Sequence, residues 1–138
     1  MVPDFVPLYS IVIVLFSLIY FSFASIPFLF VPLDEPVVAR LFCGLFNTYF
    51  WMVTVTGCVA ALAFAASGRT AFMVSMLLLA AVAFVARRWT IKRIDAQQGA
   101  CRAGDGRAMS RLRMLHWGGM AANFLVVASI ASSLPCIL

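Results

Sequence analysis

Four long apolar stretches without a charged residue divide this 138-residue chain, over residues 5–33, 41–68, 70–86 and 114–138. A helix that crosses a bilayer needs about 20 mainly apolar residues, with a range of roughly 17–25. None of the stretches shows the period-2 alternation of a membrane barrel strand. The pattern predicts an all-α integral membrane protein, a single four-helix bundle over residues 1–138 with spans at about 8–31, 41–66, 70–88 and 114–134.

Proline, glycine and polar residues mark the boundaries of these helices. Pro27 predicts a kink or a less regular end to the first helix. The turn L-D-E-P predicts a second helix from Pro36 to Ala66 with Asp34 or Glu35 as N-cap, and Ser67 and Gly68 predict a tight link to the third. The third helix is expected to continue past Ala86 as an extension over residues 87–93, and the fourth helix to resume near Ser110 or Arg111. The basic connection between the two spans, residues 89–113, then contains a segment over 97–106 that is expected to be mobile.

The basic residues are concentrated in one place and predict the orientation. The chain is 64% hydrophobic and 11% charged, with a sequence pI near 9.5. Because the positive charge lies beside membrane spans, membrane topology and anionic lipid headgroups explain it better than binding to nucleic acid. Eight of its ten Lys and Arg residues lie between Arg87 and Arg113, Arg40 falls on the same side of the membrane, and Arg69 and Asp4 on the other. The positive-inside rule predicts a cytoplasmic basic loop, both termini in the periplasm or exterior, and a bacterial inner membrane as the location.

The number of basic residues exceeds what orientation requires. We therefore expect contact with anionic lipid headgroups or with an acidic partner through Arg87, Arg88, Lys92, Arg93, Arg111 and Arg113. The long apolar run at the N-terminus, without a basic region before it, is expected to be a retained helix rather than a signal peptide.

Small residues at four-residue spacing predict close helix packing. One such stripe is Gly57, Ala61 and Ala65, and a shorter one is Gly118 and Ala122. We expect both to face neighbouring helices.

Chemistry-bearing residues are scarce. No Asp, Glu or Lys lies deep within a span, which disfavours a proton-coupled pump, and no catalytic set is apparent, so we expect no enzyme activity. His116, Met120 and Asn123 share one helix face, where they could ligate a soft metal such as copper with sulfur from Met73, Met76 or Met109, or bind haem, a pigment or a quinone. The alternative is structural: a histidine that bonds a neighbouring helix, with Asn123 linking helices. No cofactor is required.

Two stretches carry a family resemblance. P-F-L-F-V-P-L-D-E-P-V-V-A-R-L-F-C-G-L-F-N-T-Y-F begins at Pro27, and R-L-R-M-L-H-W-G-G-M-A-A-N-F-L begins at Arg111. Together they resemble the four-helix membrane family called domain of unknown function 4149, which includes transmembrane protein 205-like proteins. The residues that fit its pattern are Pro27, Leu29, Phe30, Leu45, Phe46, Tyr49, Phe50, His116 and Asn123. The resemblance implies a four-helix bundle and a linked His116–Asn123 pair, and no activity. The chain departs from the pattern with H-W-G-G, where the family often has a small polar residue.

Three functions follow as hypotheses. The first is a non-catalytic accessory subunit that packs laterally against a larger membrane complex, such as an energy-transducing respiratory or photosynthetic one, or a homo-oligomer. The second is metal or cofactor handling through His116 and Met120. The third is passive transport or lipid interaction, which a polar cavity formed by five residues would favour, namely Asn47, Thr48, Thr54, Thr56 and Asn123.

Overall fold

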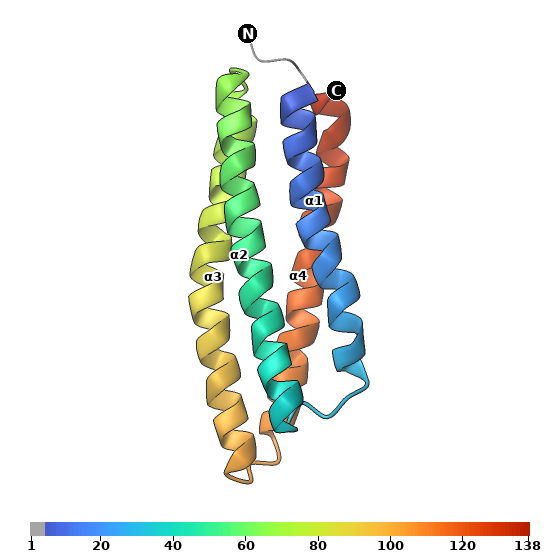
Figure 1. The fold of residues 1–138 in the computed structure, drawn as a ribbon, viewed down its shortest axis with the longest axis vertical. Coiled ribbons are helices and arrows are strands. Elements are labelled where there is room, and N and C mark those ends of the chain that lie inside the picture. Colours follow the sequence, from blue (N-terminus) through green and yellow to red (C-terminus); the bar gives the residue numbers. More distant parts are fainter. Residues whose placement is uncertain (1–4) are drawn as a thin grey trace.

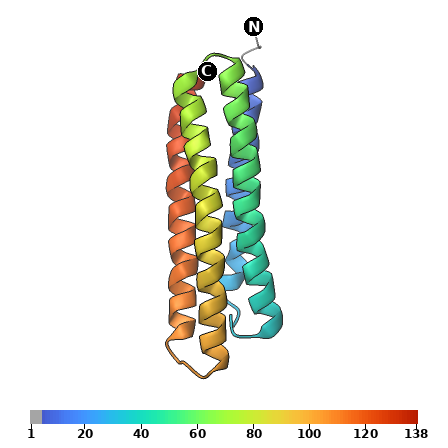
Figure 2. The ribbon, with the colours of Figure 1, turned by 90° about the vertical axis from the view of Figure 1, so that its left-hand side faces the viewer.

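The computed structural model describes residues 5–138, so Asp4 and the possible helix start after Pro3 lie outside the described residues. Its elements are α1 (Phe5–Ser25), the short 3-10 helix η1 (Ile26–Leu29), α2 (Pro36–Ala66), α3 (Thr70–Arg102) and α4 (Ala108–Ile137). The four long helices form an up-down bundle in which α1 packs on α2 and α4, and α3 packs on the same two helices (Figures 1 and 2). Each is long and apolar enough to cross a membrane, so the chain is an integral membrane protein.

The two ends of the bundle differ in what they carry. The α2–α3 link, the start of α1 and the end of α4 lie at one end, and the α1–α2 and α3–α4 connections lie at the other, which we call the basic end (Figure 1). At the first end, the Arg69 guanidinium donates to the carbonyl oxygen of Ile137 and ties the link to α4. Gly68 has φ +73°, a backbone conformation that glycine adopts without steric cost, which explains the tight turn.

Proline and glycine place the helix ends as the sequence predicts in the first half of the chain. The α-helical geometry of α1 stops at Ser25, and Pro27 lies within the less regular η1. Pro36 is the first residue of α2, which ends at Ala66. Glu35 occupies the N-cap position, but its side chain makes no capping hydrogen bond.

The predicted extension of the third helix past Ala86 is confirmed, and the connection to α4 is shorter than the mobile segment predicted over residues 97–106. α3 continues to Arg102 and α4 begins at Ala108, so only residues 103–107 connect them, with Gly104 at φ +90°. Most residues from Trp89 to Arg102 have ordinary or good helix propensity, and Gly99 lies on an exposed surface where its cost is small. Buried Thr90, Ile94 and Gln98 give this part of α3 an inner face, which supplies the packing that stabilises the extension.

Small residues allow two close helix contacts, one predicted and one not. A Cβ atom on Gly57 of α2 would lie 3.2 Å from the Cβ of Ala80 in α3, and Ala61 is buried one turn later, whereas Ala65 is exposed and ends the stripe early. On α4, Gly118 and Ala122 are exposed, and a Cβ on Gly118 would meet nothing within 4 Å. The contact glycine is Gly119, whose added Cβ would lie 3.0 Å from the Phe46 ring. Within the described residues, Gly118 therefore makes no close helix contact, and its neighbour Gly119 does.

Candidate functional site

A buried polar network joins three helices near the middle of the bundle. The Tyr49 hydroxyl in α2 donates to Asn123 Oδ1 in α4 at 2.9 Å. Asn123 Nδ2 donates to the Leu18 carbonyl at 3.0 Å and to the Ser22 hydroxyl oxygen at 2.8 Å, both in α1. Asn123 is 1% exposed. Its predicted role in linking helices is confirmed, since every one of these bonds crosses between helices.

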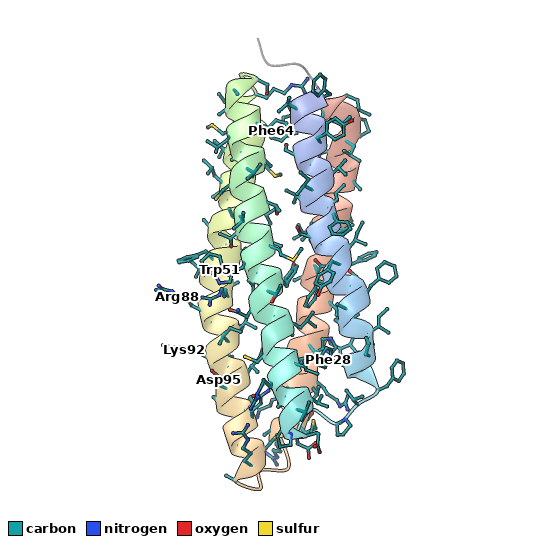
Figure 3. All side chains as sticks on the ribbon, viewed as in Figure 1. Phe28, Trp51, Phe64, Arg88, Lys92 and Asp95 are labelled. Atoms are coloured by element: carbon teal, nitrogen blue, oxygen red, sulfur yellow. The ribbon has the colours of Figure 1, made fainter. Side chains whose placement is uncertain are left out.

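His116 lies in an aromatic enclosure on the same face of α4. The imidazole is 1% exposed, and its ring centre lies 5.3 Å from that of Phe42, 6.3 Å from Phe46 and 6.5 Å from Phe28, each ring nearly perpendicular to it. Figure 3 labels Phe28, which reaches this region from η1. Both ring nitrogens are buried, and neither has a hydrogen-bond partner among the residues that the structure describes. The His116–Asn123 pair implied by the family resemblance is not bonded directly, because all Asn123 contacts go to α1 and α2.

The surroundings of His116 contain few metal ligands. Within residues 5–138, no three His, Cys, Asp or Glu side chains gather where they could hold a metal ion. Met76 lies beside Gly57, which is about three turns along α2 from Phe46, so Met76 and its neighbour Met73 are far from the imidazole. Only Met120 and Met109, which are partly buried in α4, remain as sulfur donors from the predicted set.

An apolar groove lies between α3 and α4, with α2 as its floor. Its volume is about 370 Å³, within the range of roughly 300–1,000 Å³ that ligand pockets occupy. We call it the α3–α4 groove and define it by its lining residues, which are Phe46, Tyr49, Phe50 and Val53 of α2, Leu79, Val82, Ala83, Ala86, Trp89 and Thr90 of α3, and Met114, Leu115, Gly118, Gly119, Ala122, Asn123 and Val126 of α4. Val82, Gly118 and Ala122 are exposed, so the groove opens outward, toward the lipid around an integral membrane protein.

A second, smaller pocket continues from the groove toward the basic end. It has a volume of about 300 Å³ and is lined by Arg93 and Gln97 of α3 and by Arg111, Met114 and Leu115 of α4. Met114 and Leu115 also line the groove, so the two spaces adjoin. The side-chain amide oxygen of Gln97, Oε1, is buried and has no hydrogen-bond partner in the described part of the chain. We call this space the Arg93–Arg111 pocket.

The six basic residues predicted to contact lipid or a partner fall into two groups. Arg87 donates to Asn47 at 2.8 Å and lies over the Trp51 ring, and Arg113 donates to the carbonyls of Leu29 and Val31, so both are held within the bundle. The other four are Arg88, Lys92, Arg93 and Arg111, all exposed. Arg88 extends away from α3 in Figure 3 and lies 5.2 Å from the Phe84 ring.

The polar residues that would favour transport do not share a cavity. The hydroxyls of Thr54 and Thr56 donate to carbonyls of their own helix. Asn47 lines a separate polar cleft of about 410 Å³ between α2 and α3, while Asn123 lines the α3–α4 groove. Thr48 is exposed and lines neither space. A polar path through the bundle, the feature that this hypothesis required, is therefore not formed by these five residues.

Three residues were not predicted from the sequence to belong to the site, although Tyr49 was among those that fit the family pattern. Tyr49 is a buried tyrosine within a long apolar run, and such a hydroxyl usually needs a partner, which was an available signal. Gln97 was assigned to the loop, so its place on a helix was missed. Gly119 adjoins Gly118, and the sequence alone does not indicate which of the two glycines faces an aromatic ring of a neighbouring helix.

Comparison with known proteins supports the family resemblance. The sequence model of one protein family, described as Domain of unknown function (DUF4149), matches residues 9–97, which is well over half of the chain. The match contains the first resembling stretch with Tyr49, and it ends before His116 and Asn123. Searches of curated proteins and of solved structures gave no match. The chain, with its four membrane-spanning helices, belongs to the DUF4149 family.

Proposed function

We propose that this protein is a non-catalytic membrane protein that binds a lipid molecule in the α3–α4 groove. The observation that carries the proposal is the groove itself, an apolar space of about 370 Å³ that opens laterally between two spans. Small side chains on α4, Gly118 and Ala122, leave this space unfilled. A membrane-spanning helix is surrounded by lipid hydrocarbon. An acyl chain is therefore the occupant that fits both the apolar lining of the groove and the direction in which it opens.

The length of the groove supports an acyl chain as the occupant. On α3 its lining runs from Leu79 to Thr90, about 16 Å along the helix axis at 1.5 Å per residue. This is close to half of a hydrocarbon core of about 30 Å. The Trp89 side chain lines the end nearest the basic residues, the level where tryptophan favours the membrane interface. The groove therefore corresponds to one leaflet, that of the basic end.

Filling the groove is the experiment that tests this proposal. The variant Ala122→Phe places a ring in the groove, whereas Ala121→Phe, its exposed neighbour outside the groove lining, is the matched control. We expect Ala122→Phe to lower the phospholipid that stays bound after purification in mild detergent, measured by native mass spectrometry, by several fold. Ala121→Phe should retain as much lipid as the unmodified protein. Equal lipid retention in all three proteins would overturn the proposal.

Lateral packing against a larger membrane complex is a second candidate function, favoured by the unequal burial of the helices. In the apolar 18-residue stretch of α3 and in that of α4, 17% of the residues are buried inside the bundle. The corresponding share in the spans of α1 and α2 is 33%. The small residues Gly118 and Ala122 would let a partner helix approach closely. A photo-crosslinking residue at Leu78 or Leu125 should then yield one recurrent protein adduct in native membranes, and one at Phe16 of α1 should not. Lipid adducts at all three positions would count against a partner.

A further inference from the structure

We propose that the Arg93–Arg111 pocket binds the headgroup of an anionic glycerophospholipid that carries a free hydroxyl, as a phosphatidylglycerol does. This inference rests on the proposed function, because it assigns the headgroup of the lipid whose chain lies in the α3–α4 groove. The two spaces adjoin through Met114 and Leu115, so one molecule can occupy both.

The position of the pocket matches the depth of a headgroup. Arg93 follows Thr90, the last groove residue on α3, by three positions, and Gln97 follows by seven, so they lie about 4–10 Å further along the helix axis. An acyl chain that follows the groove therefore leads its phosphate to the level of these two residues. Trp89 lies between the apolar and the polar part, as expected at an interface.

The charges of the pocket suit a phosphate. Arg93 stacks its guanidinium 4.3 Å from the Trp89 ring centre, which orients the group and leaves its N–H edge available. Arg111 comes from α4 and makes one long contact of 3.5 Å with the exposed Asp105 carboxylate. Two guanidinium groups and one carboxylate give the pocket a net positive charge. A guanidinium can donate two parallel hydrogen bonds to two oxygens of one phosphate.

Gln97 supplies the feature that selects among phosphate-bearing lipids. Its buried side-chain amide oxygen has no hydrogen-bond donor among the described residues. A buried acceptor without a partner destabilises the fold. A headgroup hydroxyl next to the phosphate would donate to this oxygen. A choline headgroup has no N–H or O–H donor, and its positive charge would face Arg93 and Arg111. The pocket therefore favours a hydroxyl-bearing anionic headgroup over a choline one.

The test compares two lipids with identical acyl chains on the delipidated full-length protein in detergent. Affinities for dioleoyl-phosphatidylglycerol and dioleoyl-phosphatidylcholine are measured by native mass spectrometry, with dioleoyl-phosphatidylmethanol as a lipid of the same charge that lacks a headgroup hydroxyl. We expect Arg93→Gln and Arg111→Gln each to weaken phosphatidylglycerol binding about fivefold and to leave phosphatidylcholine binding unchanged. Gln97→Leu should weaken phosphatidylglycerol binding more than phosphatidylmethanol binding.

Arg88→Gln is the matched control, because it removes the same charge from an exposed position of α3 outside the pocket. If it weakens phosphatidylglycerol binding as much as Arg93→Gln, the attraction is diffuse and the headgroup site is overturned. An unchanged lipid preference in Gln97→Leu overturns the role of the hydroxyl. Displacement of the lipid by inorganic phosphate would show that free phosphate is the ligand.

The headgroup and the groove can fail separately. If Ala122→Phe releases both lipids but the unmodified protein binds them equally, the groove binds acyl chains and the headgroup inference is wrong. If Ala122→Phe releases neither lipid, the proposed function itself is wrong, whatever the arginine variants do.

Discussion

The side of α4 that faces α1 and α2 is filled with packed and hydrogen-bonded side chains, whereas the side that faces α3 borders an open groove. On the first side, His116 lies among phenyl rings, Gly119 meets Phe46 and Asn123 bonds two other helices. On the second side, Gly118 and Ala122 border the groove, and a Cβ added at Gly118 would meet nothing within 4 Å. We refer to these regions as the closed seam and the α3–α4 groove.

The comparison separates what holds the bundle together from what is free to bind. The closed seam contains contacts that fix the register of three helices, because Tyr49, Asn123 and the Leu18 carbonyl must align for their hydrogen bonds to form. The groove contains no such bond between α3 and α4 among the described residues. Tyr49 and Asn123 also line the inner wall of the groove. A change to these bonded residues should therefore mainly alter stability, and a change to the outward-facing groove residues Gly118 and Ala122 should mainly alter binding. The predictions below test this division.

The largest loss of stability is expected for Asn123→Leu. Leucine has a similar size but leaves the Tyr49 hydroxyl, buried at 8% exposure, without its acceptor, and removes two donor bonds to α1. Interhelical hydrogen bonds in membranes contribute about 0.6 kcal/mol each, up to about 1.7, and an orphaned buried group costs about 1–3 kcal/mol. We expect a loss of about 2–3 kcal/mol in the free energy of unfolding, measured by reversible denaturation in mixed micelles.

The double variant Asn123→Leu with Tyr49→Phe is the control for that prediction. It removes both partners of the bond, so no hydroxyl is left unpaired, and it should recover part of the lost stability. Stability that stays unchanged in Asn123→Leu would mean that the seam does not fix the bundle, and the division between the two regions would fail.

Two adjacent glycines provide the next test, with a smaller effect. Gly119→Ala places a Cβ atom 3.0–3.2 Å from the Phe46 ring, which is itself enclosed by Phe21 and Phe42 at 5.1–5.2 Å between ring centres and cannot easily move. Overpacking of this kind costs about 1–3 kcal/mol, and the better helix propensity of alanine offsets part of it. We expect Gly119→Ala to lower the free energy of unfolding by about 1 kcal/mol.

Gly118→Ala is its matched control, since nothing lies within 4 Å of the added atom. We expect this variant to be as stable as the unmodified protein or up to about 1 kcal/mol more stable. Equal effects of the two substitutions would show that the ring contact at Gly119 has no energetic weight, and that the seam and the groove side of α4 are alike.

The sequence predicts the helices of this bundle more completely than the contacts between them. Charge-free runs and prolines suffice for the spans, since bilayer thickness and backbone hydrogen bonding leave few alternatives. The extension of α3 past Ala86 was predicted, but residues 97–102 were assigned to a mobile loop because Gly99, Gly104 and Gly106 lie close together in the sequence. Packing of the inner face of α3, with Gln98 buried, helps to stabilise these last turns. Helix rotation decides whether Gly118 or Gly119 meets a ring, and the four-residue spacing of Gly118 and Ala122 indicates the wrong one of the two.

The same limit applies to the candidate site. Asn123 was predicted to link helices because a buried amide must find partners, but its bond to Tyr49 depends on how α2 and α4 are placed relative to each other. The Arg93–Arg111 pocket combines residues 18 positions apart on two helices whose connecting segment was predicted too long. Side chains that meet across a helix pair cannot be matched until the ends of both helices are known.

The smallest expected effect concerns His116, which is the one member of the closed seam with unpartnered polar atoms. In His116→Phe, a phenyl ring replaces an imidazole whose two nitrogens have no hydrogen-bond partner among the described residues and whose neighbours are Phe28, Phe42 and Phe46. Removing unpaired buried polar atoms while keeping an aromatic ring of similar shape is neutral or stabilising. We expect a gain of about 0.5–1 kcal/mol in the free energy of unfolding of the metal-free protein, with bound lipid unchanged. A loss of stability in the metal-free His116→Phe protein would contradict this prediction. Copper that elemental analysis finds in the unmodified protein and not in His116→Phe would place a ligand site inside the closed seam, so that the seam as well as the groove would serve binding.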